Sequence, residues 1–311
     1  MIKQSFPARL SLNVIMLTSI LFIATIATAS YSSHKILAEE AQTSSEHLLA
    51  SAIKDIEKSL GNVESSIQSV AWLVDENNTD KEYLYHIVEK IVAENDNIIG
   101  STVAFAPEYF AGEHFFSPYA YCENGRIYTK QLGTDKYDYF SMEWYRDAAD
   151  SGKPHWSEPY YDEGGADTMM STYSYPLKDS SGRTYAVITA DISLKWLNEL
   201  LLSIKPYPNS YVILVSAEGE LINVDNFHVK EGNLFSWADS VKDERFLKIS
   251  RDMAAGRKGL GRFFSGTELA FAVYDSLSNG WSAAMLCRYR DVLVRTSRMH
   301  IILIMIGLFG L

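Results

Sequence analysis

An uncharged apolar run at residues 10–31 constrains this chain more than any other feature. Only Ser, Thr and Asn interrupt it as polar residues, and as a helix it is long enough to cross about 30 Å of hydrocarbon. Lys3 and Arg9 precede it, so the positive-inside rule places residues 1–9 in the cytoplasm. The alternative is a cleaved signal peptide, because Ala27-Thr28-Ala29 offers small residues to a signal peptidase. We predict an uncleaved membrane helix, since a helical pattern continues directly out of the run.

A second apolar run occupies residues 299–311 and contains no charged residue after His300. It is too short to cross a bilayer and ends without a polar flank. We therefore expect the sequence to stop inside a second membrane helix, which leaves residues 32–298 outside the cytoplasm. A C-terminal anchor or a buried strand is the alternative.

Composition favours a folded, acidic protein. The chain is 47% hydrophobic and 22% charged, so it can bury a core. A net charge of −11 argues against nucleic acid as a partner.

The only two cysteines, Cys122 and Cys287, fall in what we interpret as different domains, which favours two free buried thiols over a disulfide. Neither Cys nor His shows metal-ligand spacing, so we predict no metal and no cofactor.

Residues 32–79 continue from the membrane as one long helix. Apolar residues step along it by four and three alternately: Leu49, Ile53, Ile56, Leu60, Val63, Ile67, Val70 and Val74. A period of about 3.5 residues is typical of a coiled-coil seam or of a helix laid against a domain. Both interpretations stay open here, and the first predicts a homodimer through this signalling helix.

The rest of the soluble part predicts two successive α+β modules with antiparallel sheets. Residues 80–205 contain helical patterns at 81–95, 142–151 and 194–204, with β patterns at 98–105, 115–122, 126–132, 168–176 and 184–192. Pro206 and Pro208 then interrupt the chain. Residues 206–292 contain β patterns at 211–215, 220–224, 261–264, 269–274 and 281–286, with a helical pattern at 243–255.

Aromatic rings and carboxylates recur in the first module. The set includes Tyr137, Trp144, Tyr145, Asp162 and Asp191. Rings can form the apolar walls of a small pocket and attract a cation, and carboxylates accept from an ammonium group. Other interpretations exist for each: the rings could pack a helix onto a sheet, Asp162 could belong to a turn, and Asp191 could cap a helix starting near Leu194.

Several segments together resemble the double Cache (dCache) sensor domains of bacterial transmembrane receptors. They are residues 143–146, 152–161, 190–194 and 279–282, and the resemblance extends over roughly residues 35–300. It implies a long helix with a membrane-distal module (80–205) and a membrane-proximal module (206–292) of PAS-like topology. It also implies a small ligand in the distal module. It further implies a protein anchored in a bacterial inner membrane, with residues 32–298 in the periplasm.

In amino-acid-binding members of that family the pocket motif is Tyr, then Arg five positions on, then Trp-Tyr, then two acidic residues. The matching ligand-binding residues here, with Tyr173 added as a lining residue, are Tyr137, Met142, Trp144, Tyr145, Asp162, Tyr173 and Asp191. Met142 stands at the arginine position, and a thioether cannot hold a carboxylate through a two-pronged contact. Arg146 is nearby in the sequence, but it lies one helical turn away from Met142, so its side chain should point away from the pocket. The resemblance therefore favours an amine-bearing ligand over an ordinary amino acid.

No catalytic pattern supports an enzyme in this chain: the sequence has no Gly-x-Ser-x-Gly motif and no phosphate-binding glycine-rich loop. We predict the sensing portion of a membrane signal-transduction receptor. Its cytoplasmic output would lie beyond this sequence, and a histidine kinase or a serine/threonine phosphatase is favoured. The alternatives are a stand-alone membrane-anchored binding module and a secreted enzyme whose signal peptide ends near Ala29.

Overall fold

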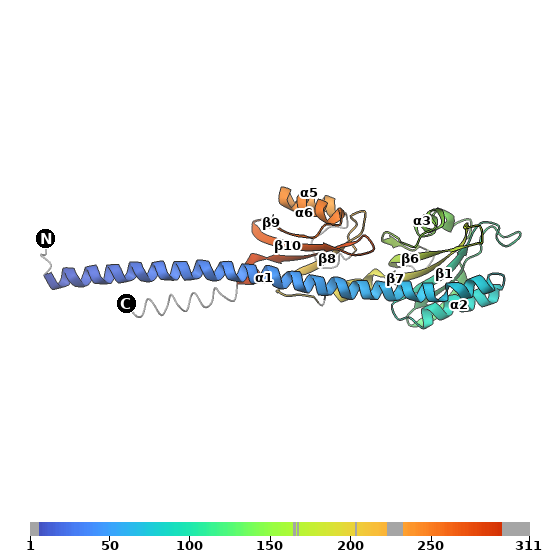
Figure 1. Cartoon of the computed structure of the whole chain (residues 1–311), viewed down its shortest axis with the longest axis horizontal. Coiled ribbons are helices and arrows are strands. Elements are labelled where there is room, and N and C mark those ends of the chain that lie inside the picture. Colours follow the sequence, from blue (N-terminus) through green and yellow to red (C-terminus); the bar gives the residue numbers. More distant parts are fainter. Residues whose placement is uncertain (1–5, 164–165, 167, 203, 223–232, 294–311) are drawn as a thin grey trace.

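The chain folds as a long helical rod, and two sheet modules lie beside the C-terminal half of that rod (Figure 1). The computed structural model describes residues 6–163, 166, 168–202, 204–222 and 233–293. The predicted α+β class with a long N-terminal helix and two antiparallel sheets is confirmed. The second apolar run, 299–311, lies outside the described residues.

Helix α1 (Phe6–Asn77) forms the rod. By length and composition it can cross a membrane, and its apolar N-terminal window is not buried by the rest of the chain. Farther along, the apolar seam turns inward: Leu49, Ile56 and Ile67 are at most 1% exposed. The core-facing interpretation of the seam is therefore correct from Leu49 to Val74, while pairing with a second copy stays a prediction.

The distal module contains a seven-stranded antiparallel sheet, ordered β3-β2-β1-β7-β6-β4 with β5 also paired to β6. Its strands are β1 (Gly100–Phe105), β2 (Pro118–Glu123), β3 (Arg126–Gln131), β4 (His155–Trp156), β5 (Tyr160–Tyr161), β6 (Met169–Lys178) and β7 (Thr184–Ser193). Its helices are α2 (Lys81–Ala93), the 3-10 turn η1 (Tyr139–Ser141), α3 (Glu143–Ser151) and α4 (Leu194–Leu202). Both long central strands are buried along almost their whole length, so both faces of the sheet are covered.

The proximal module contains a four-stranded antiparallel sheet, ordered β8-β11-β10-β9. The strands are β8 (Tyr211–Val215), β9 (Gly259–Ser265), β10 (Glu268–Ser276) and β11 (Ser282–Arg288), and the helices are α5 (Leu234–Val241) and α6 (Glu244–Ala254). Asp243 starts α6 by accepting the backbone N–H of Arg245 on its carboxylate, which is a normal N-cap.

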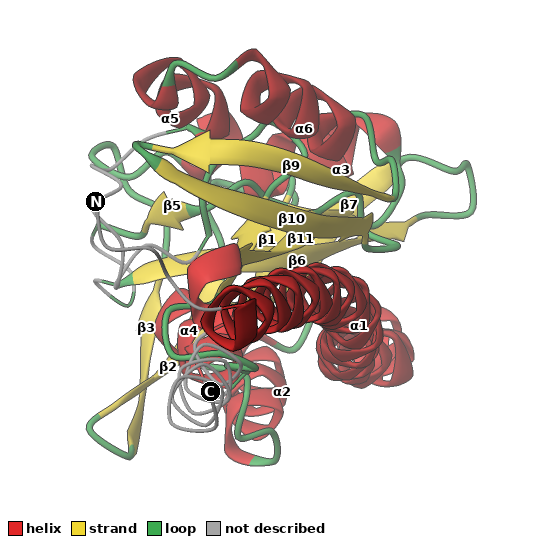
Figure 2. Cartoon of the chain, turned by 90° about the vertical axis from the view of Figure 1, so that its left-hand side faces the viewer, coloured by secondary structure: helices red, strands yellow, loops and turns green. Residues whose placement is uncertain are grey.

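Three layers result. Figure 2, viewed along the rod, shows α1 and α2 on one side of the sheets and α5 and α6 on the other. One continuous core joins α1 and α2 to the inner faces of both sheets. Two further clusters fill the opposite faces, one beneath α3 and one beneath α5 and α6. Both modules are thus fixed to the same helix, and each keeps a second covered face of its own.

Some local expectations were wrong. The sequence pattern did not predict α5, β4 or β5, which are short. The predicted strand 220–224 is reduced to isolated bridges at Glu220 and Leu221 in its described part. Both cysteines are free, but Cys122 is exposed at the end of β2 and only Cys287 is buried. The expectation of two buried thiols therefore fails for Cys122.

Candidate functional site

A cluster of rings and polar groups lies between α3 and the distal sheet. Its buried members are Ala104, Tyr119, Leu132, Tyr139, Trp144, Tyr145, Ala148 and Val187. Tyr137, Met142 and Tyr160 pack against it half-buried. Helix α3 brings in Trp144 and Tyr145 because it presents only one face to the sheet, whereas Arg146 is exposed and bonds to the adjacent Asp147. The structure therefore gathers the predicted Tyr137, Met142, Trp144 and Tyr145.

Asp191 enters this cluster from the central strand β7 and is 4% exposed. The residues paired with it are Gly100 on β1 and Thr172 on β6. The Thr172 hydroxyl donates to Asp191 Oδ1 at 2.8 Å, and the Tyr160 hydroxyl lies 2.8 Å from the same Thr172 oxygen. Asp191 is an interior strand residue three positions before α4 begins, so the helix-cap interpretation is not what the structure shows.

Asp162 approaches from the segment that follows β5 and is also 4% exposed. Its Oδ1 accepts the Tyr137 hydroxyl at 3.0 Å, and its Oδ2 accepts the backbone N–H of Ala166 at 2.8 Å. It lies close enough to Asp191 for its negative charge to act on that carboxyl. Two carboxylates from distant parts of the sequence thus converge on one buried region.

Gly100 leaves room for this convergence. A Cβ atom at this position would lie 2.4 Å from Asp191 Oδ2 and 2.4 Å from the Tyr119 hydroxyl. Any larger residue would therefore displace one of the two polar groups. The close approach requires glycine here for space, because no positive φ is involved at this position.

The electrostatics of the cluster are unusual for carboxyl groups. Burial, and next the charge of Asp162, raise the pKa of Asp191 to about 7, and the Thr172 and Tyr119 hydroxyls only partly oppose this. Burial and the nearby carboxylates also raise the pKa of Tyr119, Tyr137 and Tyr160 above the usual tyrosine value. Among the described residues, neither carboxylate forms an ion pair with a lysine or arginine. The Lys130 ammonium lies 5.7 Å from the centre of the Tyr119 ring.

Two buried polar groups in the cluster make no hydrogen bond of ordinary geometry among the described residues. The Tyr119 hydroxyl lies near Asp191 and the Trp144 indole N–H lies near the Tyr137 hydroxyl, close enough in each case to affect a pKa. Neither makes a hydrogen bond of ordinary geometry within the described part of the chain, although Tyr119 is 1% and Trp144 3% exposed. Buried polar groups without partners are uncommon in native proteins and require an explanation.

Tyr173 does not join the cluster. It lies on the opposite face of β6 from Thr172, where Gln68 of α1 donates to its hydroxyl at 2.8 Å and its ring contacts Trp156. Successive residues of a strand point to opposite faces, so Thr172 and Tyr173 cannot both face α3. We leave Tyr173 out of the site that we propose below.

Sequence reasoning missed the neighbours of Asp191 in this region, among them Gly100, Tyr119 and Thr172. Thr172 could have been found from strand alternation once the register of β6 against β7 was known, but the sequence alone does not supply that register. Tyr119 and Gly100 carry no pattern of their own. Only strand pairing brings them next to Asp191.

Another group of titratable side chains lies outside the cluster. Glu143, Asp147 and His155 offer ligand atoms that all lie within 4.8 Å of one another, a spacing that could hold a metal ion. They are half-buried, with His155 Nε2 3.5 Å from Glu143 Oε1 and 3.9 Å from Asp147 Oδ2. Polar contacts between the imidazole and the two carboxylates explain the arrangement equally well.

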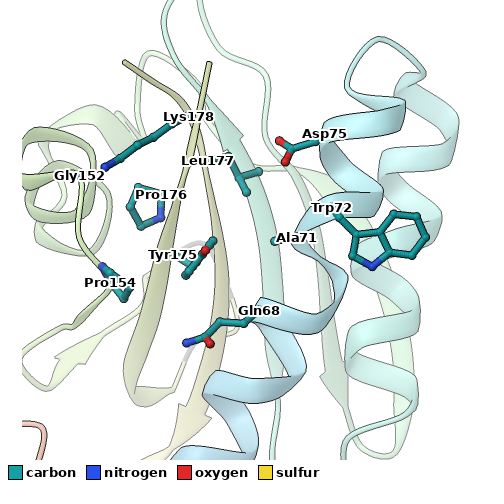
Figure 3. A pocket seen from close by; sticks show the side chains of 10 residues that line it. All are labelled: Gln68, Ala71, Trp72, Asp75, Gly152, Pro154, Tyr175, Pro176, Leu177 and Lys178. Atoms are coloured by element: carbon teal, nitrogen blue, oxygen red, sulfur yellow. The ribbon is translucent and has the colours of Figure 1, made fainter. Parts of the chain in front are cut away.

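A groove of about 400 Å³ lies between the end of α1 and β6. Figure 3 shows its lining residues, with the Lys178 side chain directed toward Gly152 and Asp75 facing the groove from α1. The groove is open to solvent on one side and contains none of the seven predicted site residues. A second open groove of about 480 Å³ shares Asp75 and Lys178 with it.

Comparison with known proteins shows similarity to receptor sensor domains. Residues 84–199, which include the whole cluster, match the family model described as methyl-accepting chemotaxis protein-like, first PDC sensor domain. The chain has the fold of an extracellular receptor sensor domain. It resembles the extracellular domain of the putative histidine kinase mmHK1S-Z2, with a TM-score of 0.68 at 18% identity over 83% of this chain and 99% of the other.

Chemoreceptor domains share this sensor fold. The periplasmic sensory domain of the Campylobacter jejuni chemoreceptor Tlp1 matches with a TM-score of 0.67 at 14% identity, covering 83% of this chain and 98% of the other. The ligand binding domain of Mlp24 with asparagine matches with a TM-score of 0.61 at 13% identity, covering 85% and 98%. At these identities the likeness concerns the fold. The finer assignment to the double Cache family stays a prediction.

Proposed function

We propose that this chain is the sensing portion of a bacterial membrane receptor and that its distal module binds a small amine-bearing molecule. The supporting observation is a pair of buried carboxylates, Asp162 and Asp191, that have no cationic partner among the described residues. A buried charge is costly unless it is paired. An ammonium group supplies the missing charge, and its three N–H donors suit carboxylate and hydroxyl oxygens.

The unpaired groups suggest how such a ligand would be oriented. Its ammonium would lie between Asp162 and Asp191 and could also donate to the Tyr119 hydroxyl. The Trp144 N–H can only donate, so it would bind an oxygen elsewhere on the ligand. The rings of Tyr137, Trp144 and Tyr145 would form the walls, and a cation beside such rings gains about 0.5–2 kcal/mol. Met142 stands where an arginine would favour a carboxylate, which supports an amine over an amino acid.

For the whole protein we propose a receptor anchored in the inner membrane by residues 10–31, with residues 32–298 in the periplasm and double Cache architecture. Ligand binding would shift the balance between two arrangements of α1 and the proximal strands. A homodimer through α1 and a histidine kinase or serine/threonine phosphatase output belong to the same proposal.

A thermal-shift screen tests the ligand. The soluble part of the chain is mixed with primary amines, amino acids, carboxylates and sugars. We expect an amine to raise the melting temperature, since a ligand at one hundred times its Kd stabilises the folded state by about 2.7 kcal/mol. Asp162→Asn and Asp191→Asn should each weaken that amine about 10- to 100-fold, the range expected for a lost charge-assisted hydrogen bond.

Asp135→Asn serves as the matched control. It removes one negative charge from an exposed position two residues before Tyr137, so it should leave amine affinity almost unchanged. A screen in which only carboxylates or sugars shift the melting temperature would refute the amine proposal. Equal weakening by all three variants would point to net charge rather than to this site.

A further inference from the structure

The segment 155–161 consists of β4, β5 and the three residues between them, and it contacts three parts of the molecule. It leads directly into Asp162 and lies beside α1, α3 and the proximal module. Its residues are His155, Trp156, Ser157, Glu158, Pro159, Tyr160 and Tyr161. Nothing in the ligand proposal requires a segment of this kind, so its contacts call for a separate account.

At its C-terminal end the segment is bonded to the carboxylate cluster. Tyr160 reaches Thr172 through its hydroxyl, and Thr172 in turn donates to Asp191. Ser157 is bonded twice to the backbone of Thr172: its N–H donates to the Thr172 carbonyl at 2.9 Å, and its hydroxyl accepts the Thr172 N–H at 3.0 Å. A displacement of Thr172 or Asp191 therefore acts directly on this segment.

In its middle, Glu158 connects the two modules. Its backbone N–H donates to Glu143 Oε1 of α3 at 2.9 Å, while its own carboxylate accepts the backbone N–H of Glu218 in the proximal module at 3.3 Å. The second oxygen, Oε2, is buried with no hydrogen bond of ordinary geometry among the described residues. Burial is the main cause that raises the pKa of Glu158, although Ser216 and the Glu218 N–H partly oppose it.

At its N-terminal end, Trp156 contacts both α1 and the proximal module. Its indole N–H donates to Glu64 Oε1 of α1 at 2.8 Å. Its ring lies 6.0 Å from the ring of Trp281, which is 1% exposed and directly precedes β11. Trp281 thus lies at the start of β11 (Ser282–Arg288), the last strand among the described residues.

We propose that residues 155–161 transmit a change at Asp162 and Asp191 to the proximal module and to α1, with Glu158 as the positioning residue across the junction. This goes beyond the ligand proposal and does not depend on which molecule binds. A segment that merely holds the modules together would make the same contacts. Transmission differs because a change in the cluster must alter the junction, and must do so through Glu158.

Hydrogen exchange of the full chain in lipid nanodiscs measures this dependence without a ligand. Thr172→Val removes the hydroxyl between Asp191 and Tyr160 and so disturbs the cluster. The readout is amide exchange at residues 216–221, compared in the unaltered chain, Thr172→Val, Glu158→Ala and the double variant. We expect Thr172→Val to change exchange there about two- to thirty-fold, the range of typical coupling between sites, and to change it little when Glu158 is alanine.

Two controls separate transmission from simple loss of structure. Glu158→Gln keeps an acceptor oxygen for the Glu218 N–H, and Glu218→Ala keeps that N–H, so both should retain the response. If Glu158→Ala also loosens α6, Glu64→Leu provides a second test, because it leaves the Trp156 indole in place and removes the acceptor of its N–H. The response of α1 amides around residue 64 to Thr172→Val should then be lost.

The proposal is overturned if amides 216–221 respond to Thr172→Val equally when residue 158 is glutamate and when it is alanine. It is also overturned if Thr172→Val alone, with Glu158 in place, leaves the exchange of these amides unchanged. No amine is present in this experiment, so its failure leaves the amine proposal intact. Conversely, a failed ligand screen would leave the transmission result standing.

Discussion

The two modules share one helix and one type of sheet, but they cover the outer faces of their sheets in different ways. In the proximal module, α5 and α6 bury a packed apolar cluster that includes Phe246, Ile249, Met253 and Phe263. The buried hydroxyls of Ser250 and Ser282 near it both donate to backbone carbonyls. In the distal module, α3 covers two carboxylates, several hydroxyls and an indole N–H for which the described residues offer no hydrogen bond of ordinary geometry.

The contrast separates a requirement of the fold from a requirement of function. A sheet of this kind can be closed by apolar packing alone, as the described part of the proximal module shows. Placing two carboxylates under α3 instead costs stability, because a carboxylate loses its hydration when it is buried. Selection for stability does not explain such an arrangement. We therefore expect the proximal face to respond to mutation as a core and the distal face to respond as a binding site.

The largest effect should come from Phe246→Ala. Phe246 is 1% exposed, and its ring lies 4.6 Å from that of Phe263 and 4.9 Å from that of Trp237. Loss of the ring should lower the free energy of unfolding by about 3–5 kcal/mol, as is typical for buried aromatic residues. Urea denaturation followed by tryptophan fluorescence measures this. A loss below about 1 kcal/mol would mean that the proximal face is not packed as a core, and the contrast would fail.

Asp191→Asn should change how the stability of the chain depends on pH. The folded-state pKa of about 7 lies above the ordinary 3.8, so between these values the folded chain keeps a proton that the unfolded chain releases. Stability of the unaltered chain should therefore fall as pH rises from about 4 to about 7, at up to about 1.4 kcal/mol per pH unit. Asparagine cannot ionise, so the variant should lack this slope and be the more stable protein at pH 8. Unfolding curves measured from pH 4 to pH 8 test it.

The contribution of Asp243, in the proximal module, should depend on pH in the opposite direction. Arg245 and the backbone N–H of Phe264 hold the pKa of Asp243 below its usual value, so the stability that it contributes is present at neutral pH and is lost in acid. Asp243→Asn should lower stability at pH 7 by no more than about 2 kcal/mol, because asparagine is also a good N-cap. If Asp191→Asn and Asp243→Asn shift stability in the same direction at pH 8, the contrast between the two environments is wrong.

The sequence was informative wherever a periodic pattern decides the structure. The seam of α1, the hairpin β2–β3 and the central strands β6 and β7 follow from spacing and turn residues, and their observed bounds lie within a few residues of those expected. Long-range register was the missing information. Whether Thr172 or Tyr173 faces Asp191 depends on how β6 pairs with β7, and a shift of one residue reverses the answer. The role of Gly100 is likewise visible only after β1 pairs with β7, since no local pattern marks it.

Gly100→Ala bears most directly on the distal cluster. The new methyl group would lie 2.4 Å from both Asp191 Oδ2 and the Tyr119 hydroxyl, so one of them must move. Overpacking of this kind typically lowers stability by about 1–3 kcal/mol, and the displaced carboxylate should also abolish any amine-induced thermal shift. Gly61→Ala is the matched control: it lies in α1 with no atom within 4 Å of the added methyl, so alanine should raise stability by up to about 1 kcal/mol. If Gly100→Ala proved as harmless as Gly61→Ala, Asp191 and Tyr119 would have room to separate, and the close approach at Gly100 would not constrain the distal cluster.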